Sequence, residues 1–415
     1  MEQLSYDRRK IFRLSAVFAL IYFFSPNGLA ALPGITISFL LKDTLHMTAS
    51  QASYFTAITI LGWALKPLWG IISDMFPILG YRRKSYLIVT SLGAAAIWFV
   101  LGSMEHYSTA SILLLFTLSS IMYAFMDVLC DALMVETGKP MNLTSRFQSV
   151  QWTAVYTASI ITGLAGGWVA THWNPQRTFS VNALFPLMIL AAIFFFLKET
   201  CIGDVATQRR ASLQALREAA RDTQLWLLAT FLFFVAFSPS FGAPFFYYSV
   251  DALKFDPMLF GTAASVGAAS SAIGAILYGK YGNVFKTRML VKLAIIVGTV
   301  ATLFDLVYFI PFITAHLDFA RWIYLSSAAV LGGVGAITFI VMLNAAAIAC
   351  PRWSEGTTFA TLTAFWNMGL MGSSALGGYL FGIIGLQPLI VISALFTAAA
   401  WLFLPRLRFA DEGVM

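Results

Sequence analysis

The sequence predicts an all-α membrane protein with twelve transmembrane helices in two pseudo-symmetric six-helix bundles. Hydrophobic residues make up 59% of the 415 residues and charged residues only 11%, whereas about 25% of the residues in a soluble domain are charged. Apolar segments of membrane-spanning length recur throughout the chain. One long polar stretch, 198–222, separates six such segments from another six.

Each apolar segment is long enough to cross the hydrocarbon core as a helix, which takes about 20 residues. The first six helices are expected at 15–41, 49–73, 85–104, 109–136, 147–171 and 181–198. The second six are expected at 223–250, 257–280, 288–313, 319–349, 356–382 and 386–404. We therefore divide the chain into an N-terminal six-helix bundle (1–200), a cytoplasmic middle loop (201–222) and a C-terminal six-helix bundle (223–415).

The positions of Lys and Arg indicate the orientation of these helices. If both termini are cytoplasmic, only Lys42, Arg177, Lys254 and Arg321 fall outside, and Lys66 falls within the membrane. Such a bias is typical of multi-pass membrane proteins, because basic loops resist translocation. We expect a protein of the cell (inner) membrane whose net charge of +7 reflects topology and contact with lipid, and no nucleic-acid partner.

The two halves share a short sequence element. Phe24-Ser25-Pro26 in the first predicted helix recurs as Phe237-Ser238-Pro239 in the seventh. Helices that are interrupted at matching positions of a six-helix repeat are typical of transporters, whose substrate site lies between the halves. The sequence therefore favours two bundles that rock about a central cavity.

Two carboxylates lie within the fourth predicted helix. Asp127 and Asp131 are four residues apart, so both project from one face. Charged residues inside a membrane are costly and often mark ion or substrate paths. We predict that Asp127, and next Asp131, serves proton coupling or substrate recognition. The alternative is a structural ion pair with Lys66 or Arg146.

Lys66 is the one cation expected within the membrane. It could bind an anionic substrate, or it could neutralise Asp127 or Asp131. A third interpretation is that its side chain extends to the cytoplasmic surface. The sequence favours this third one, because Asp74 at the end of the helix is only about two turns away.

A basic turn between the second and third helices predicts a cytoplasmic gate. Arg82 and Arg83 follow the turn at Pro77 and Gly80. The carboxylates expected within reach of these arginines are those of Asp74 and Glu136. We expect an ion-paired latch whose role is chiefly structural, although opening and closing it would also serve transport.

Further candidates for substrate binding are polar or aromatic residues in helices that would line a central cavity. Aromatic rings can stack on a flat ligand while amides bind its edges. Each residue is equally consistent with a hydrogen bond between helices. The set comprises Asn27, Gln151, Trp152, Asn344, Trp366 and Asn367, together with Lys66.

Several classes of protein are disfavoured. The sequence contains no GxxxxGK[ST], HExxH or GxSxG motif, so we do not expect an ATP-driven pump, a protease, an esterase or another enzyme. Cys130, Cys201 and Cys350 form no CxxC pair, and we predict neither a metal site nor a cofactor.

Four stretches resemble the folate-biopterin transporters, a branch of the major facilitator superfamily. Residues 66–86, KPLWGIISDMFPILGYRRKSY, are similar to the signature loop of that family. Residues 127–136, DVLCDALMVE, resemble its fourth-helix pattern of two aspartates and a glutamate. Ala31-Leu32-Pro33 with 39–43, and Cys350-Pro351 with 355–360, resemble its first helix and the entry to its eleventh.

The resemblance implies the twelve-helix major facilitator fold and secondary active transport of a folate- or pterin-like solute, with protons as the coupling ion. The chain departs from the family at Arg352-Trp353-Ser354 and at Trp366, near the expected ligand. The alternatives are a transporter of another small metabolite or drug, and a non-transporting receptor or assembly subunit with this fold. We expect a monomer.

Overall fold

The computed structural model describes residues 2–138, 141, 143–199, 214, 221–281, 284–348 and 355–407, and it is built from helices. Ten helices in these ranges are long and apolar enough to span a membrane. The expected spans 223–250 and 356–382 correspond to two shorter helices in series and to one 30-residue helix. The predicted all-α membrane fold is confirmed.

Three of the first six spans consist of more than one helix. Their breaks follow Phe24, Thr59, Ala64 and Asn182. The helices are α1 (Glu2–Phe24) and α2 (Gly34–Phe39), then α3 (Ala49–Thr59), α4 (Leu61–Ala64) and α5 (Lys66–Met75), then α6 (Lys84–Ser103), α7 (Thr109–Gly138), α8 (Thr144–His172), α9 (Pro175–Asn182) and α10 (Leu184–Phe196).

The second half repeats the break in its first span, after Ala236. Its helices are α12 (Thr223–Ala236), α13 (Gly242–Asp251), α14 (Pro257–Tyr281), α15 (Thr287–Phe304), α16 (Pro311–Ala315), α17 (Leu317–Ile348), α18 (Glu355–Ile384) and α19 (Leu386–Ala399). The middle stretch from 200 to 220 lies outside the described residues except for Gln214.

The Phe-Ser-Pro repeat coincides with a break in both halves. α1 ends at Phe24, the first residue of its repeat, and α12 ends at Ala236, one residue before its repeat begins. Proline lacks the backbone N–H that continues a helix. Neighbouring helices replace the lost hydrogen bonds: the backbone N–H of Ser240 donates to the carbonyl of Ser373 at 3.0 Å. Such replacement is needed wherever backbone is irregular within a membrane.

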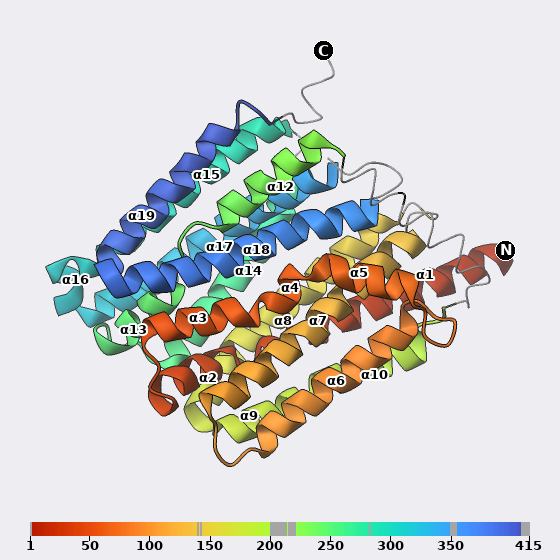
Figure 1. Ribbon diagram of the computed structural model, residues 1–415, viewed down its shortest axis with the longest axis horizontal. Helices are drawn as coiled ribbons and strands as arrows, with labels where there is room; N and C mark the ends of the chain where they lie inside the picture. Colours follow the sequence, from red (N-terminus) through yellow and green to blue (C-terminus); the bar gives the residue numbers. More distant parts are fainter. Residues whose placement is uncertain are drawn as a thin grey trace.

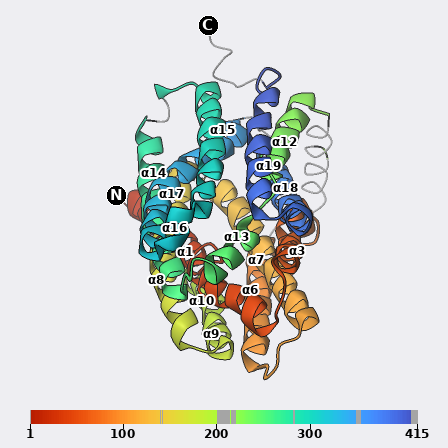
Figure 2. The ribbon, with the colours of Figure 1, turned by 90° about the vertical axis from the view of Figure 1, so that its left-hand side faces the viewer.

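Hydrophobic side chains form separate cores in the two halves. One core extends from Leu14 to Leu197 and the other from Leu225 to Leu407, with a smaller cluster around Tyr308. Figure 1 shows α12, α15 and α19 of the second half on one side, and α6 and α10 of the first half on the other. Between them, α18 packs along α3 and α4, and α8 packs along α14 (Figure 2).

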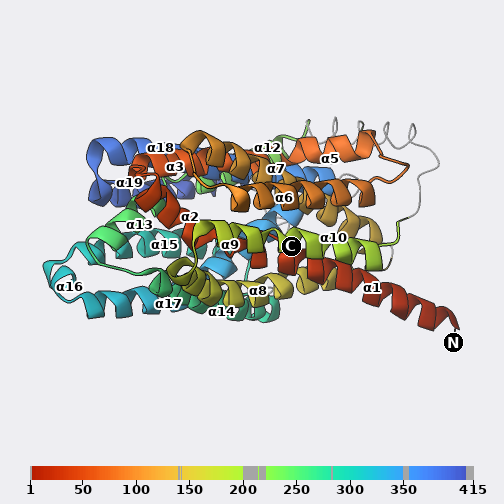
Figure 3. The ribbon, with the colours of Figure 1, turned by 90° about the horizontal axis from the view of Figure 1, so that it is seen from below.

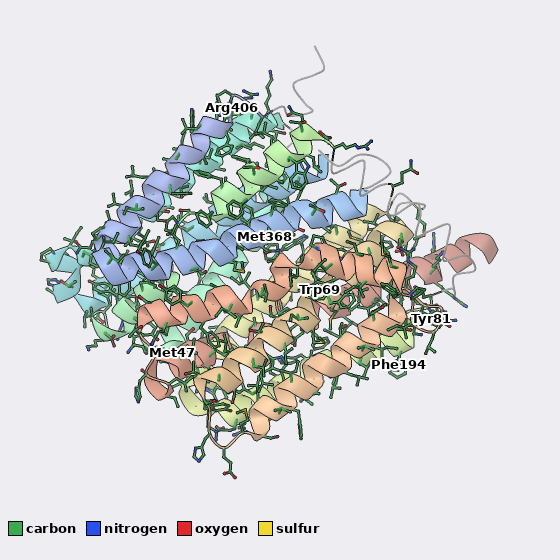
Figure 4. All side chains as sticks on the ribbon, viewed as in Figure 1. Met47, Trp69, Tyr81, Phe194, Met368 and Arg406 are labelled. Atoms are coloured by element: carbon green, nitrogen blue, oxygen red, sulfur yellow. The ribbon has the colours of Figure 1, made fainter. Side chains whose placement is uncertain are left out.

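The two ends of the molecule differ in charge. We call the end that carries the turn at Arg82 and Arg83 the basic end, and the end that carries Lys42 and Asp251 the opposite end. α1 projects beyond its neighbours at the basic end, whereas α13 and α16 lie at the opposite end (Figure 3). Tyr81 marks the basic turn in Figure 4.

The bundles approach each other closely along α8 and α14. A Cβ atom added to Gly163 would lie 2.6 Å from the backbone nitrogen of Ser265, so a larger residue there would push the helices apart. The Ser265 hydroxyl donates to the carbonyl of Ile160 at 2.6 Å and accepts from the N–H of Leu164 at 2.8 Å. This contact lies toward the opposite end and joins the two halves there.

Candidate substrate and coupling site

Four side chains from three helices form a buried charged set in the first bundle. Lys66 on α5 places Nζ 2.6 Å from Oδ2 of Asp127 on α7. Tyr22 on α1 donates its hydroxyl to Asp127 at 3.1 Å and to Asp131 at 2.8 Å. The side chains of Lys66 and Asp127 are only 11% and 14% exposed. The structure therefore unites the two predicted carboxylates with the predicted cation.

Local structure explains why these groups meet. α5 begins at Lys66 after a break at Leu65, and Pro67 occupies its first turn, where a missing N–H costs nothing. Asp127 and Asp131 are one turn apart on α7 and therefore face the same neighbour. Tyr22 lies in the last full turn of α1, next to the Phe-Ser-Pro break. The helix breaks thus place polar groups opposite the carboxylates.

Lys66 does not extend to the surface as the sequence favoured. The residue is 8% exposed, and its ammonium lies 4.9 Å from the centre of the Trp63 ring in addition to pairing with Asp127. A buried carboxylate without a cation would be very costly in this environment. The ion pair therefore prevails over hydration of the lysine at the helix end.

The charged set is out of balance by one charge. It contains one ammonium, Lys66, and two carboxylates, Asp127 and Asp131, so the fully ionised set carries one negative charge. One proton on a carboxylate would make the set neutral. Sites within a membrane that change charge in this way are typical of proton relays.

A small cavity of about 10 Å³ adjoins the set. Tyr22, Asn27, Trp63, Tyr123 and Asp127 are among the residues that line it. This volume is enough for about one water molecule. Asn27 thus lines the same cavity as Asp127. Its backbone carbonyl accepts a hydrogen bond from the Ser159 hydroxyl of α8 at 3.0 Å.

An aromatic layer joins the two bundles. The ring of Trp152 on α8 lies 5.8 Å from that of Phe339 on α17, which lies 6.0 Å from that of Trp366 on α18. Next to Trp366, the Asn367 side chain donates to the carbonyl of Trp63 at 3.3 Å. Two predicted candidates, Trp152 and Asn367, therefore contact the other bundle. A third, Trp366, contacts Phe339, which in turn contacts Trp152.

Gln151 and Asn344, also predicted as candidates, are not placed in this layer. Gln151 is 2% exposed and its amide lies 3.8 Å from the sulfur of Cys130. This contact between α8 and α7 corresponds to the interhelical alternative considered for the amides. Asn344 belongs to α17, but its side chain lies outside the described residues.

The four residues predicted as a gate form one ion cluster at the basic end. Arg83 donates to Asp74 and to Glu136, each at 2.7 Å, and to the Ser73 hydroxyl at 2.5 Å. Arg82 also pairs with Asp74, and its guanidinium lies 3.5 Å from Glu136. All these residues belong to the first bundle, so the cluster ties α5, the basic turn and α7 together.

The electrostatics of the cluster keep Arg83 charged. Burial lowers the pKa of the guanidinium, but the carboxylates of Glu136 and Asp74 more than offset this effect, and the pKa lies above its ordinary value. A buried arginine with two such partners forms strong charge-assisted hydrogen bonds. Arg83 therefore stays ionised across the physiological pH range.

Sequence reasoning missed three residues at these sites. Tyr22 links the two aspartates, and Phe339 is the centre of the aromatic layer. Glu199 accepts hydrogen bonds from the backbone N–H groups of Arg82, Arg83 and Lys84, at 3.1, 3.1 and 2.6 Å, and so caps the start of α6. For Glu199, a carboxylate just after the sixth apolar segment was the available signal.

Solved structures share this architecture. A bacterial homologue of the human lysosomal transporter Spinster, in an inward-facing conformation, has a TM-score of 0.64 at 14% identity and covers 96% of each chain. A D-xylose–proton symporter has a TM-score of 0.68 at 12% identity and covers 95% of this chain and 97% of its own. These likenesses show the major facilitator fold. The fold and the ten apolar spans in the described ranges define a multi-pass membrane protein.

The sequence identifies the branch of that superfamily. The model of the BT1 family matches residues 27–404, and the chain belongs to this family, as predicted. It is 28% identical to a folate-biopterin transporter from Synechocystis, over 96% of this chain and 83% of that protein. It is 24% identical to a probable folate-biopterin transporter from Arabidopsis thaliana, over 89% and 88%.

Proposed function

We propose that the protein is a proton-coupled secondary transporter of folates or pteridines that works by alternating access. The observation that carries this proposal is the buried set of Lys66, Asp127, Asp131 and Tyr22, which is out of balance by one charge. Relatives over most of the chain are described as folate-biopterin transporters, and this supports the choice of solute.

In the proposed mechanism, Asp131 exchanges the proton. Asp127 is held by the Lys66 ammonium at 2.6 Å. Among the residues that the structure describes, the hydrogen-bond partner of the Asp131 carboxylate is the shared Tyr22 hydroxyl, at 2.8 Å. A proton is therefore more easily accepted by Asp131. When Asp131 is neutral, Tyr22 can turn fully toward Asp127, and the charged set of Lys66, Asp127 and Asp131 carries no net charge.

The aromatic layer is the proposed site for the flat ring of the solute. A pterin ring between Trp152 and Trp366 would replace their contacts with Phe339 by stacking contacts of similar kind. Asp127 retains lone pairs that can accept hydrogen bonds from an aminopyrimidine edge. Lys66 is the cation available in this region for an anionic tail, and Asn27 and Asn367 are further candidates for binding the ring edge.

Alternating access would use the contacts at the two ends. At the opposite end Lys42 pairs with Asp251 of the second bundle at 2.6 Å, so this contact must break for that end to open. At the basic end we propose that the Asp74, Arg82, Arg83 and Glu136 cluster acts as the gate when the second bundle closes on it. We also propose that the basic end faces the cytoplasm of a cell-membrane protein, with 1–200 and 223–415 as the moving units of a monomer.

The proposal is tested by uptake into proteoliposomes. Labelled folate and labelled pterin are supplied with and without an inward proton gradient, and unlabelled folate, pterin, nucleosides, sugars and amino acids serve as competitors. We expect uptake that is driven by the proton gradient and is inhibited by unlabelled folate and pterin but by none of the other solutes. Asp127→Asn should abolish this uptake. Arg177→Gln, at the opposite end, is the matched control and should transport normally. Competition by another solute class, without competition by pterins, would refute the choice of substrate.

A further inference from the structure

A groove on the outer surface of the first bundle is not used by the proposed transport path. It has a volume of about 420 Å³ and runs between α1 and α8. Ala19 and Phe23 contribute from α1, and Val150 and Ala154 from α8. Arg146, Ser149, Thr153 and Thr157 add polar groups along the same side of α8.

The groove faces the membrane and not the aromatic layer between the bundles. Trp152 points to the second bundle, and successive helix residues are turned by about 100°, so Thr153 and Thr157 lie on a different face of α8. Ile161, Leu164 and Trp168 continue that face and are 48%, 45% and 45% exposed. Large apolar residues with such exposure are what a lipid-facing surface requires. Figure 3 shows α1 and α8 at the outer surface of the molecule.

Charge is confined to one end of the groove. Arg146 is exposed and lies in the first turn of α8. Thr157 is eleven residues further along, which corresponds to about 16 Å at 1.5 Å per residue. The Thr157 hydroxyl is satisfied within its own helix, since it donates to the carbonyl of Thr153 at 2.8 Å. The groove thus combines a cationic mouth with a mostly apolar floor.

The depth of Arg146 matches the level of lipid headgroups. Phe18 of α1 contacts Phe147 of α8, with ring centres 5.1 Å apart, so Arg146 and the start of the apolar part of α1 lie at similar depth. Exposed Arg13 precedes that apolar part by one turn. Basic residues at this level attract anionic lipids. Both helices therefore change from charged to apolar at the same depth.

From this geometry we infer that the groove binds one anionic phospholipid, with its phosphate on Arg146 and an acyl chain between α1 and α8. A phosphate matches the guanidinium in charge and in hydrogen-bond geometry. The length of the groove suits an extended hydrocarbon chain. A zwitterionic lipid of the same chain length would fill the groove without the gain in charge pairing.

Native mass spectrometry of the full chain in detergent tests this inference. The protein is incubated with phosphatidylglycerol or with phosphatidylcholine of the same acyl chains, and in a third arm with inorganic phosphate. Phosphatidylglycerol should be retained in preference to phosphatidylcholine, and inorganic phosphate should neither bind stably nor displace it. Equal retention of the two lipids, or displacement by phosphate, would overturn the inference.

Three variants locate the lipid. Arg146→Gln should weaken phosphatidylglycerol binding about fivefold, whereas Lys280→Gln, which removes an exposed cation from the end of α14, should not change it. Ala19→Phe fills the groove without altering charge and should also weaken binding. If Arg146→Gln does not fold, Ala19→Phe still decides the matter. Binding unaffected by the groove variants would place the lipid elsewhere and refute the assignment.

Discussion

Replacing Lys66 by methionine should destabilise the protein more than replacing its partner Asp127 by asparagine. Lys66→Met removes the one cation of the charged set and leaves Asp127 and Asp131 side by side, one turn apart on α7. Asp127→Asn instead leaves Lys66 with Asp131, so the set remains balanced. The two changes break the same ion pair, and only the residual charge differs between them.

The expected magnitudes follow from the geometry. At 2.6 Å between Nζ and Oδ2, the gross attraction is about 6 kcal/mol at an effective dielectric constant of ~20, and desolvation offsets part of it. Removing one partner of a buried pair costs about 3–5 kcal/mol, which we expect for Lys66→Met. For Asp127→Asn we expect the loss of hydrogen bonds to a charged group, about 1.5–3 kcal/mol.

The double variant separates residual charge from lost contacts. Lys66→Met combined with Asp127→Asn leaves a single carboxylate, Asp131, which can be neutralised by a proton. It should therefore be more stable than Lys66→Met alone. The free energy of unfolding is measured in mixed micelles with increasing dodecyl sulfate. Additivity of the two single changes within about 0.5 kcal/mol would refute the reasoning.

Three further tests probe the neighbouring contacts. Tyr22→Phe removes a donor shared by two carboxylates and should cost about 1.5–3 kcal/mol of unfolding free energy, measured in the same micelles; an unchanged stability would contradict the shared hydrogen bond. Arg83→Ala should cost about 3–5 kcal/mol because the guanidinium is buried, whereas Glu136→Gln, whose side chain is 41% exposed, should cost at most about 1 kcal/mol; equal losses would count against this difference. Lys42→Glu should favour opening of the opposite end, and Lys42→Glu with Asp251→Lys should close it again, as spin-label distances across that end would show; failure of the swap to restore closure would argue against a clamp.

Much of the fold follows from the sequence because the membrane restricts the possibilities. Apolar segments of the required length must be helices, and the repeat of Phe-Ser-Pro marks the breaks in the first and seventh spans. The internal division of the second span at Ile60 and Leu65 had no comparable signal, apart from Pro67. Hydropathy reports where a chain crosses the membrane and not where a helix bends within it.

The site was predictable as a set of charges but not as a set of contacts. Asp127 and Asp131 stand out because charge is rare within membrane spans. Tyr22 is one of many aromatic residues in an apolar helix, and only the packing of α1 against α7 distinguishes it. The position of Lys66 was misjudged for a related reason: spacing along its own helix favoured the surface, whereas a carboxylate on another helix determined the outcome.

The most direct test of the central claim compares two assays on Asp131→Asn in proteoliposomes. One assay is counterflow, in which labelled pterin exchanges for unlabelled pterin without a gradient, and the other is accumulation driven by a proton gradient. If Asp131 carries the proton, the variant should retain counterflow, lose accumulation and show no dependence of its exchange rate on pH. Accumulation at the wild-type level, driven by the same gradient, would contradict the account and place the coupling proton on another group.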